Sequence, residues 1–112
     1  MKERRKDKRF CLFFSLRGII LPERKNIFYT VGKDLSLKGI KILCEDFLSF
    51  KRIVRININL IDETAEMTAQ VVWCNKRPYS ERYYAGLEFL EVSEKDKCKL
   101  GHFIEKNYSL AI

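Results

Sequence analysis

The sequence lacks the features of a secreted or membrane-spanning chain. No apolar run approaches the roughly 20 residues that a helix needs to span a bilayer. The basic start is followed by an apolar run over residues 10–16, but Arg17 interrupts it and no small-residue cleavage pattern follows. We therefore expect a cytoplasmic protein with neither a secretory signal nor a transmembrane segment.

Cysteine and histidine are scarce and widely spaced. The four cysteines are Cys11, Cys44, Cys74 and Cys98, with no C-x-x-C pair among them, and His102 is the only histidine. This spacing argues against a zinc knuckle or a redox motif, and the thiols of a cytosolic chain are expected to be reduced. Nothing points to a Ser/His/Asp or Cys/His triad. The sequence therefore predicts no metal site and no enzyme.

Basic charge is plentiful, and it is concentrated at the start of the chain. The 112 residues carry a net charge of +7, with 46% hydrophobic and 33% charged residues, which is the composition of one globular domain. Residues 1–9 hold six basic residues against two acidic ones, so they carry +4 of this charge. Such a tip predicts a polyanionic partner, namely nucleic acid, a phospholipid surface or a phosphorylated small molecule. We expect residues 1–9 to form a mobile basic arm and residues 10–112 to form one domain.

Short runs in which apolar and polar residues alternate predict a β-protein. The expected strands cover residues 10–16, 27–31, 40–44, 54–60, 67–73 and 83–89. Polar connections are expected at residues 18–25, 46–51, 61–64 and 75–81. Trp73 and Phe89 lie in phase with apolar neighbours, so both are expected in the core.

The period changes after the last expected strand. Ser93 is a suitable helix N-cap, and Glu94 and Asp96 place negative charge in the first turn. Apolar residues then recur at helical spacing, which predicts a helix over about residues 93–109. The whole order predicts a mainly β fold: a small antiparallel β-barrel of about six strands with a C-terminal α-helix.

Two polar motifs stand apart from this pattern. Arg5 and Arg9 lie four residues apart directly before the first expected strand, and Asp34, Ser36 and Gly39 lie at a corner between two apolar runs. Asp and Ser side chains bond nearby backbone and Gly widens the choice of backbone conformation, so the corner could be an ordinary tight turn. It could equally present an acceptor, a hydroxyl and bare backbone to a polar ligand.

Taken together and in this order, the motifs resemble those of the PilZ domain, the bacterial receptor for cyclic di-GMP. That family is marked by R-x-x-x-R near the start, matched by Arg5 and Arg9, and by a later D/N-x-S-x-x-G, matched by the corner. Residues 69–73 and 84–89 and the helix start at Ser93 also resemble the family's later strands and closing helix. The resemblance covers nearly the whole chain.

The resemblance implies that cyclic di-GMP is the ligand, that no cofactor is needed, and that the binding residues are Arg4, Arg5, Arg9, Asp34, Ser36 and Gly39. A guanidinium fork matches both a phosphate and the O6/N7 edge of guanine. Asp34 would accept from the guanine N–H edge or orient an arginine, and Gly39 would keep side-chain bulk away. In the family, an arginine directly before R-x-x-x-R, here Arg4, goes with two stacked ligand molecules instead of one.

The predicted function is therefore that of a receptor or adaptor. Its arm would fold across the barrel rim on ligand binding, and the new surface would signal to a separate effector protein. One alternative is a small basic barrel that binds single-stranded nucleic acid. No strand shows basic and aromatic residues interleaved along one face, so a nucleic-acid partner is not expected. Another alternative is a PilZ-like protein adaptor without nucleotide, against which the intact pair of motifs argues.

Overall fold

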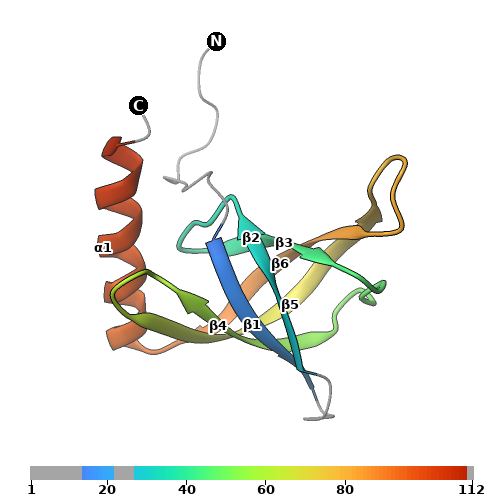
Figure 1. The fold of residues 1–112 in the computed structure, drawn as a ribbon. Helices are drawn as coiled ribbons and strands as arrows, with labels where there is room; N and C mark the ends of the chain where they lie inside the picture. Colours follow the sequence, from blue (N-terminus) through green and yellow to red (C-terminus); the bar gives the residue numbers. More distant parts are fainter. Residues whose placement is uncertain (1–13, 22–26, 111–112) are drawn as a thin grey trace.

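The structure, a computed structural model, describes residues 14–21 and 27–110, with side chains for residues 15–21 and 27–106. The described residues form six strands and one helix: β1 (Phe14–Ile20), β2 (Ile27–Lys33), β3 (Gly39–Cys44), β4 (Ile53–Asn59), β5 (Thr64–Lys76), β6 (Tyr83–Val92) and α1 (Glu94–Leu110). Neighbouring strands are antiparallel in the order β1-β2-β3-β6-β5-β4, and β4 pairs with β1 to close the barrel (Figure 1). The predicted fold class is confirmed.

The core lies inside the barrel and under the helix. Alternate residues of β4, namely Val54, Ile56 and Ile58, are buried as their period of two predicts. Full burial of each such side chain contributes about 1.5–3 kcal/mol. The helix α1 packs against β5 on one side of the barrel, and the β5–β6 hairpin projects on the other side (Figure 1). Among the described residues, no helix is long and apolar enough to cross a membrane.

The helix begins where the sequence predicts. Ser93 Oγ accepts a hydrogen bond from the backbone N–H of Asp96 at 3.1 Å, which is an N-cap. Lys99 Nζ donates to the carbonyl oxygen of Thr64 at 3.1 Å and lies 3.4 Å from Asp96 Oδ1. Leu100 on the same helix is fully buried. The cap therefore sets the start of α1, while Lys99 and Leu100 tie the helix to the barrel.

The first strand extends further along the chain than predicted. Residues 18–25 were expected to be a connection, but β1 continues through Gly18 to Ile20; residues 10–13 lie outside the described residues. A Cβ on Gly18 would lie 2.2 Å from Phe28 Cζ, so the phenyl ring of the neighbouring strand fills the space beside this glycine. A glycine covered in this way can continue a strand, although in the sequence it is typical of a loop.

The strand β5 departs from strict alternation. Met67, Ala69 and Val71 are buried as predicted, but 39% of Trp73 is exposed. The pairing with β6 shifts register between Val71 and Trp73, and such a bulge turns the following side chain to another face. The prediction that Trp73 belongs to the core is therefore wrong. The strand also runs on to Lys76, inside the expected connection at residues 75–81.

Candidate functional site

The corner that joins β2 to β3 is a tight turn held by its own serine. Ser36 is only 5% exposed, and its Oγ accepts from the backbone N–H groups of Lys38 at 3.2 Å and Gly39 at 3.3 Å. The Ser36 N–H donates to the Gly39 carbonyl oxygen at 2.9 Å. Asp34 has a φ of 56°, in the left-handed region that Asp tolerates better than most residues. Leu35 is fully buried and anchors the turn in the core.

The pairing of the strands requires a glycine at position 39. It stands opposite Glu88 in the pairing of β3 with β6, and an added Cβ would lie 2.2 Å from the carbonyl oxygen of Leu87. The backbone N–H of Phe89 donates to the Lys38 carbonyl oxygen at 2.8 Å, which extends the pairing into the turn. The glycine is therefore needed for the approach of two backbones, whatever its effect on a ligand.

A row of charged and aromatic groups leads from the corner towards the β5–β6 hairpin. Lys41 Nζ lies 3.3 Å from Asp34 Oδ2, and both side chains are largely covered, at 26% and 19% exposure. The same Nζ lies 4.9 Å from the ring centroid of Tyr84, and Arg77 Cζ lies 5.2 Å from that centroid. Each cation is within the range of a cation–π contact, so two positive groups flank the Tyr84 ring.

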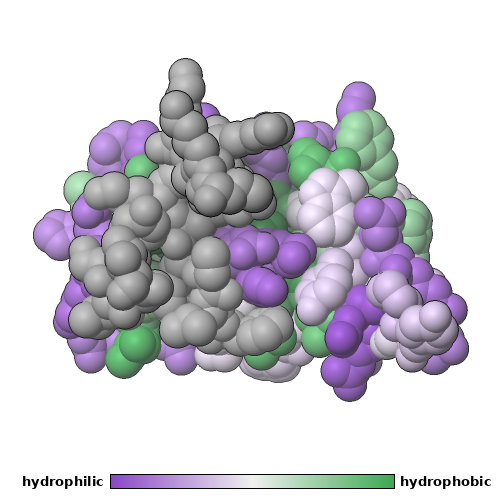
Figure 2. All heavy atoms as spheres, turned by 90° about the horizontal axis from the view of Figure 1, so that it is seen from above, coloured by the Kyte–Doolittle hydropathy of each residue, from purple (hydrophilic) through white to green (hydrophobic). Residues whose placement is uncertain are grey.

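These elements border a groove of about 430 Å³. Its lining residues are Asp34, Ser36, Lys38, Gly39, Ile40, Lys41, Val72, Trp73, Gly86, Leu87 and Glu88. The indole of Trp73 lies on Gly86, where an added Cβ would meet Nε1 at 2.1 Å. Figure 2 shows that the visible described residues on the face seen from above are a mixture of hydrophilic, near-neutral and hydrophobic ones. The groove thus joins both signs of charge, a hydroxyl and an aromatic face, at a volume common for small-ligand sites.

The structure brings half of the predicted site together. Asp34, Ser36 and Gly39 line the same groove. The other predicted residues, Arg4, Arg5 and Arg9, lie outside the described residues, so their place at this groove stays a prediction.

The lining residues that sequence reasoning missed include Lys41, Trp73 and Glu88. Trp73 was missed because the bulge is not visible in the alternation of β5. One signal could have found it, because Gly86 lies inside the expected strand at residues 83–89, and a glycine within a strand often marks the close approach of another group. Here that group is the indole.

Among the residues whose side chains are described, one thiol is buried and no cluster of metal ligands is present. Among residues 15–21 and 27–106, no group of three His, Cys, Asp or Glu side chains could hold a metal ion. Burial, with smaller contributions from the nearby Cys74 and Asp46, raises the pKa of the Cys44 thiol to about 12. A thiol with this pKa stays protonated at neutral pH and is a poor nucleophile.

The chain matches one family model and several solved structures. A family model described as "PilZ domain" matches residues 3–106. The Bacillus subtilis inhibitor of motility MotI/DgrA is 21% identical with a TM-score of 0.80, and the match covers 99% of this chain and 54% of that chain. The PilZ domain of Escherichia coli YcgR, solved with c-di-GMP, is 20% identical with a TM-score of 0.75. The match covers 97% of this chain and 95% of that chain. No curated protein sequence matches significantly.

A third structure is the complex of K. pneumonia MrkH with c-di-GMP. It is 19% identical, with a TM-score of 0.71, and the match covers 99% of this chain and 54% of that chain. At such identities the solved structures share the fold with this chain. The chain spans about half the length of the MotI and MrkH chains, at 54% of each.

Proposed function

Because this chain belongs to the PilZ domain family, we propose that it is a cyclic di-GMP receptor, which changes conformation on binding and signals to a separate partner protein. The observation that carries the proposal is the groove, in which Asp34, Ser36 and Gly39 meet. The family's other motif is present as Arg5 and Arg9. Two of the structural neighbours, the YcgR domain and MrkH, were solved with this nucleotide.

The turn prepares two groups for hydrogen bonding. Ser36 Oγ already accepts from two backbone N–H groups, so its own proton can be donated to a phosphate or base acceptor. Asp34 meets Lys41 through Oδ2, and its carboxylate can also accept from the guanine N–H edge. The lysine holds the carboxylate in place, so little freedom is lost when the base arrives.

The remaining groups fit a nucleotide with two phosphodiesters and two guanines. The exposed part of the Trp73 indole is a platform on which a base could stack. Arg5 and Arg9 would bind phosphate or guanine through bidentate hydrogen bonds from their guanidinium groups. The arm that carries them would become ordered across the groove. Four or five charge-assisted hydrogen bonds of about 1.5–3 kcal/mol each could offset that ordering. They would leave a dissociation constant on the order of 1 µM, equivalent to about −8 kcal/mol.

In this proposal the chain binds and signals, and it does not catalyse a reaction. A receptor for an intracellular nucleotide would act in the cytoplasm. Ordering of the arginine arm would present a new surface at the barrel rim, and a partner protein would read that surface.

A second candidate function is the binding of single-stranded nucleic acid. The observation in its favour is that Trp73 lines the groove while Lys41 and Arg77 flank Tyr84 at the same end of the barrel. Stacking rings beside cations are typical of single-strand binding surfaces.

Calorimetric titration with cyclic di-GMP, GMP and a short oligonucleotide, at low and at physiological salt, tests both functions. A receptor should bind cyclic di-GMP with micromolar or tighter affinity at both salt levels and bind GMP much more weakly. A nucleic-acid binder should prefer the oligonucleotide, with an affinity that falls steeply as salt rises. Absence of cyclic di-GMP binding at physiological salt would overturn the receptor proposal.

A further inference from the structure

Among the described residues, the seam between β2 and β3 is the one with the fewest paired residues in the barrel. The two strands share just two registered pairs, Gly32 with Ile42 and Lys33 with Lys41, in the part of the chain that the structure describes. On its other edge β2 pairs with β1 all the way back to Ile27. In the described residues, no strand pairs with the other backbone edge of residues 27–31, the edge to which a further strand could be added.

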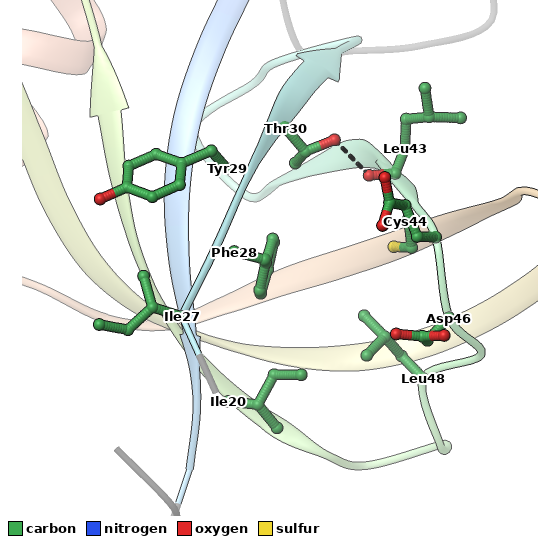
Figure 3. Close-up of a pocket in the computed structure, with 10 residues that line it drawn as sticks. Ile20, Ile27, Phe28, Tyr29, Thr30, Leu43, Cys44, Asp46 and Leu48 are labelled. Atoms are coloured by element: carbon green, nitrogen blue, oxygen red, sulfur yellow. Dashed lines mark hydrogen bonds between the residues drawn. The ribbon is translucent and has the colours of Figure 1, made fainter. Parts of the chain in front are cut away.

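A side chain marks the point where the two strands separate. Thr30 Oγ1 donates a hydrogen bond to the carbonyl oxygen of Leu43, across the position where backbone pairing has already stopped (Figure 3). Beyond Cys44 the chain leaves β3 and continues towards β4. The seam is thus closed at the corner end and open at the end that holds Ile27.

The open seam leads into a pocket of about 320 Å³. Figure 3 shows the ring of Phe28 pointing into the space between β2 and the segment after β3, with Ile20 and Leu48 below it. All three side chains pack in or against the hydrophobic core. The pocket floor is therefore a part of the core that a side chain can reach from outside.

The mouth of this pocket is acidic, although the chain as a whole carries a net charge of +7. Glu45 and Asp46 line the pocket and are exposed. Neither has an ion-pair partner among the residues whose side chains the structure describes. The rim also carries exposed aromatic and aliphatic groups, with 78% of Tyr29 and 49% of Ile27 accessible. An occupant that satisfies all of these groups must be apolar on one side and basic beside it.

We propose that this seam is a docking site for an extended segment of a partner protein. The segment adds as a strand along β2, places one apolar side chain over Phe28, and pairs a Lys or Arg with Glu45 and Asp46. Main-chain hydrogen bonds supply binding energy, while the pocket and the two carboxylates select the sequence. None of the residues that line the nucleotide groove takes part, so docking does not depend on the function proposed above.

Selection from a random library of peptides of about twelve residues, displayed on phage, tests the proposal without nucleotide. We expect the enriched peptides to carry an apolar residue flanked by Lys or Arg. Their affinity should fall by about tenfold or more for the double variant Glu45→Lys, Asp46→Lys, because attraction becomes repulsion. The matched control, Asp62→Lys with Glu63→Lys, reverses two adjacent exposed carboxylates in the β4–β5 turn and should bind as the unmodified chain does.

Hydrogen exchange then separates strand addition from contact through side chains alone. A selected peptide should slow the exchange of amides in residues 27–31 and leave β5 unchanged. Enrichment of no peptide, equal binding to both double variants, or protection elsewhere would overturn the proposal. A concentration-dependent dimer that protects the same amides would also overturn it, because a second copy would then be the occupant. Normal calorimetric binding of cyclic di-GMP by the Glu45→Lys, Asp46→Lys variant would show that its groove is intact.

Discussion

A Cβ on Gly39 would lie 2.2 Å from the carbonyl oxygen of Leu87. Real carbon and oxygen atoms do not approach so closely, and backbone on a paired strand cannot rotate away as a side chain can. The same glycine offers its N–H to Ser36 Oγ at 3.3 Å. One residue therefore fixes both the approach of β3 to β6 and the position of the hydroxyl that we assign to the ligand.

Replacing this glycine should weaken the whole barrel. We expect Gly39→Ala to lower the free energy of unfolding by about 1–3 kcal/mol, because β3 must move away from β6. Urea unfolding measures the change. The matched control is Gly101→Ala, since a Cβ at Gly101 meets nothing within 4 Å. Because Gly101 lies in the interior of α1, Gly101→Ala should raise the free energy of unfolding by about 0.5–1 kcal/mol. Similar effects of the two substitutions would contradict this account of Gly39.

The contact between Trp73 and Gly86 can be tested by fluorescence, because the chain has a single tryptophan. A Cβ at position 86 would meet the indole Nε1 at 2.1 Å, and the indole can turn away into solvent. Gly86→Ala should therefore shift the emission to longer wavelength and weaken cyclic di-GMP binding, with little loss of stability. Trp73→Phe keeps an aromatic face and should bind better than Trp73→Ala. Unchanged emission in Gly86→Ala would refute the contact.

The sequence predicts the regular elements of this fold well and the irregular ones poorly. The strands and the helix were predictable because their signals are local: β4 alternates over Val54, Ile56 and Ile58, and Ser93 precedes an acidic first turn. The exposed Trp73 was not, because a bulge depends on how β5 pairs with β6.

The candidate site likewise contains some contacts that the sequence predicts and others that it does not. Asp34, Ser36 and Gly39 could be placed together because they lie within one turn. The contact of Lys41 with Tyr84 could not, since it depends on the pairing of strands far apart in the sequence. Residues joined by a turn are predictable from spacing, whereas residues joined across a barrel require its register.

The β4–β5 turn holds a strained residue. Ile61 has a φ of 79°, which costs a β-branched side chain about 1–2 kcal/mol, and it is 77% exposed, so little packing offsets the strain. Ile61→Gly should raise the free energy of unfolding by about 1 kcal/mol, and the melting temperature by about 4–8 °C. Tyr79→Gly, at a φ of 58° in another exposed loop, is the control and should gain less, because Tyr is not β-branched. A loss of stability in Ile61→Gly would mean that its side chain makes a contact worth more than the strain.

Burial of the Cys44 thiol should appear as a dependence of stability on pH. Its pKa is raised from 9.0 to about 12, so the folded chain holds this proton more tightly than the unfolded chain does. Its contribution is complete below pH 9 and is lost as pH rises towards 12, by up to about 1.4 kcal/mol per pH unit. Urea unfolding of the unmodified chain and of Cys44→Ala, compared over this range, isolates the effect from other groups. Parallel pH profiles would contradict it.

The two arginines of the first motif provide the most direct test of the proposed receptor. Arg5→Ala and Arg9→Ala should each remove measurable cyclic di-GMP binding, because each deletes a bidentate fork, while the melting temperature stays the same. Lys8→Ala is the matched control: it removes the same charge from between the two arginines but no fork, and should change affinity far less. Asp34→Ala and Ser36→Ala should weaken binding by about tenfold or more, since each removes a hydrogen bond in a charged site.

The residue just before the motif sets the expected stoichiometry. If Arg4 supports a second, stacked nucleotide, calorimetry should find two ligands per unmodified chain and one per Arg4→Ala chain, with the first binding step nearly unchanged. One ligand per unmodified chain would reject the role proposed for Arg4 and leave the receptor proposal intact. Normal binding by Arg5→Ala or Arg9→Ala would instead reject the assigned site, because the groove at Asp34 would then hold the nucleotide without the forks that match its phosphates.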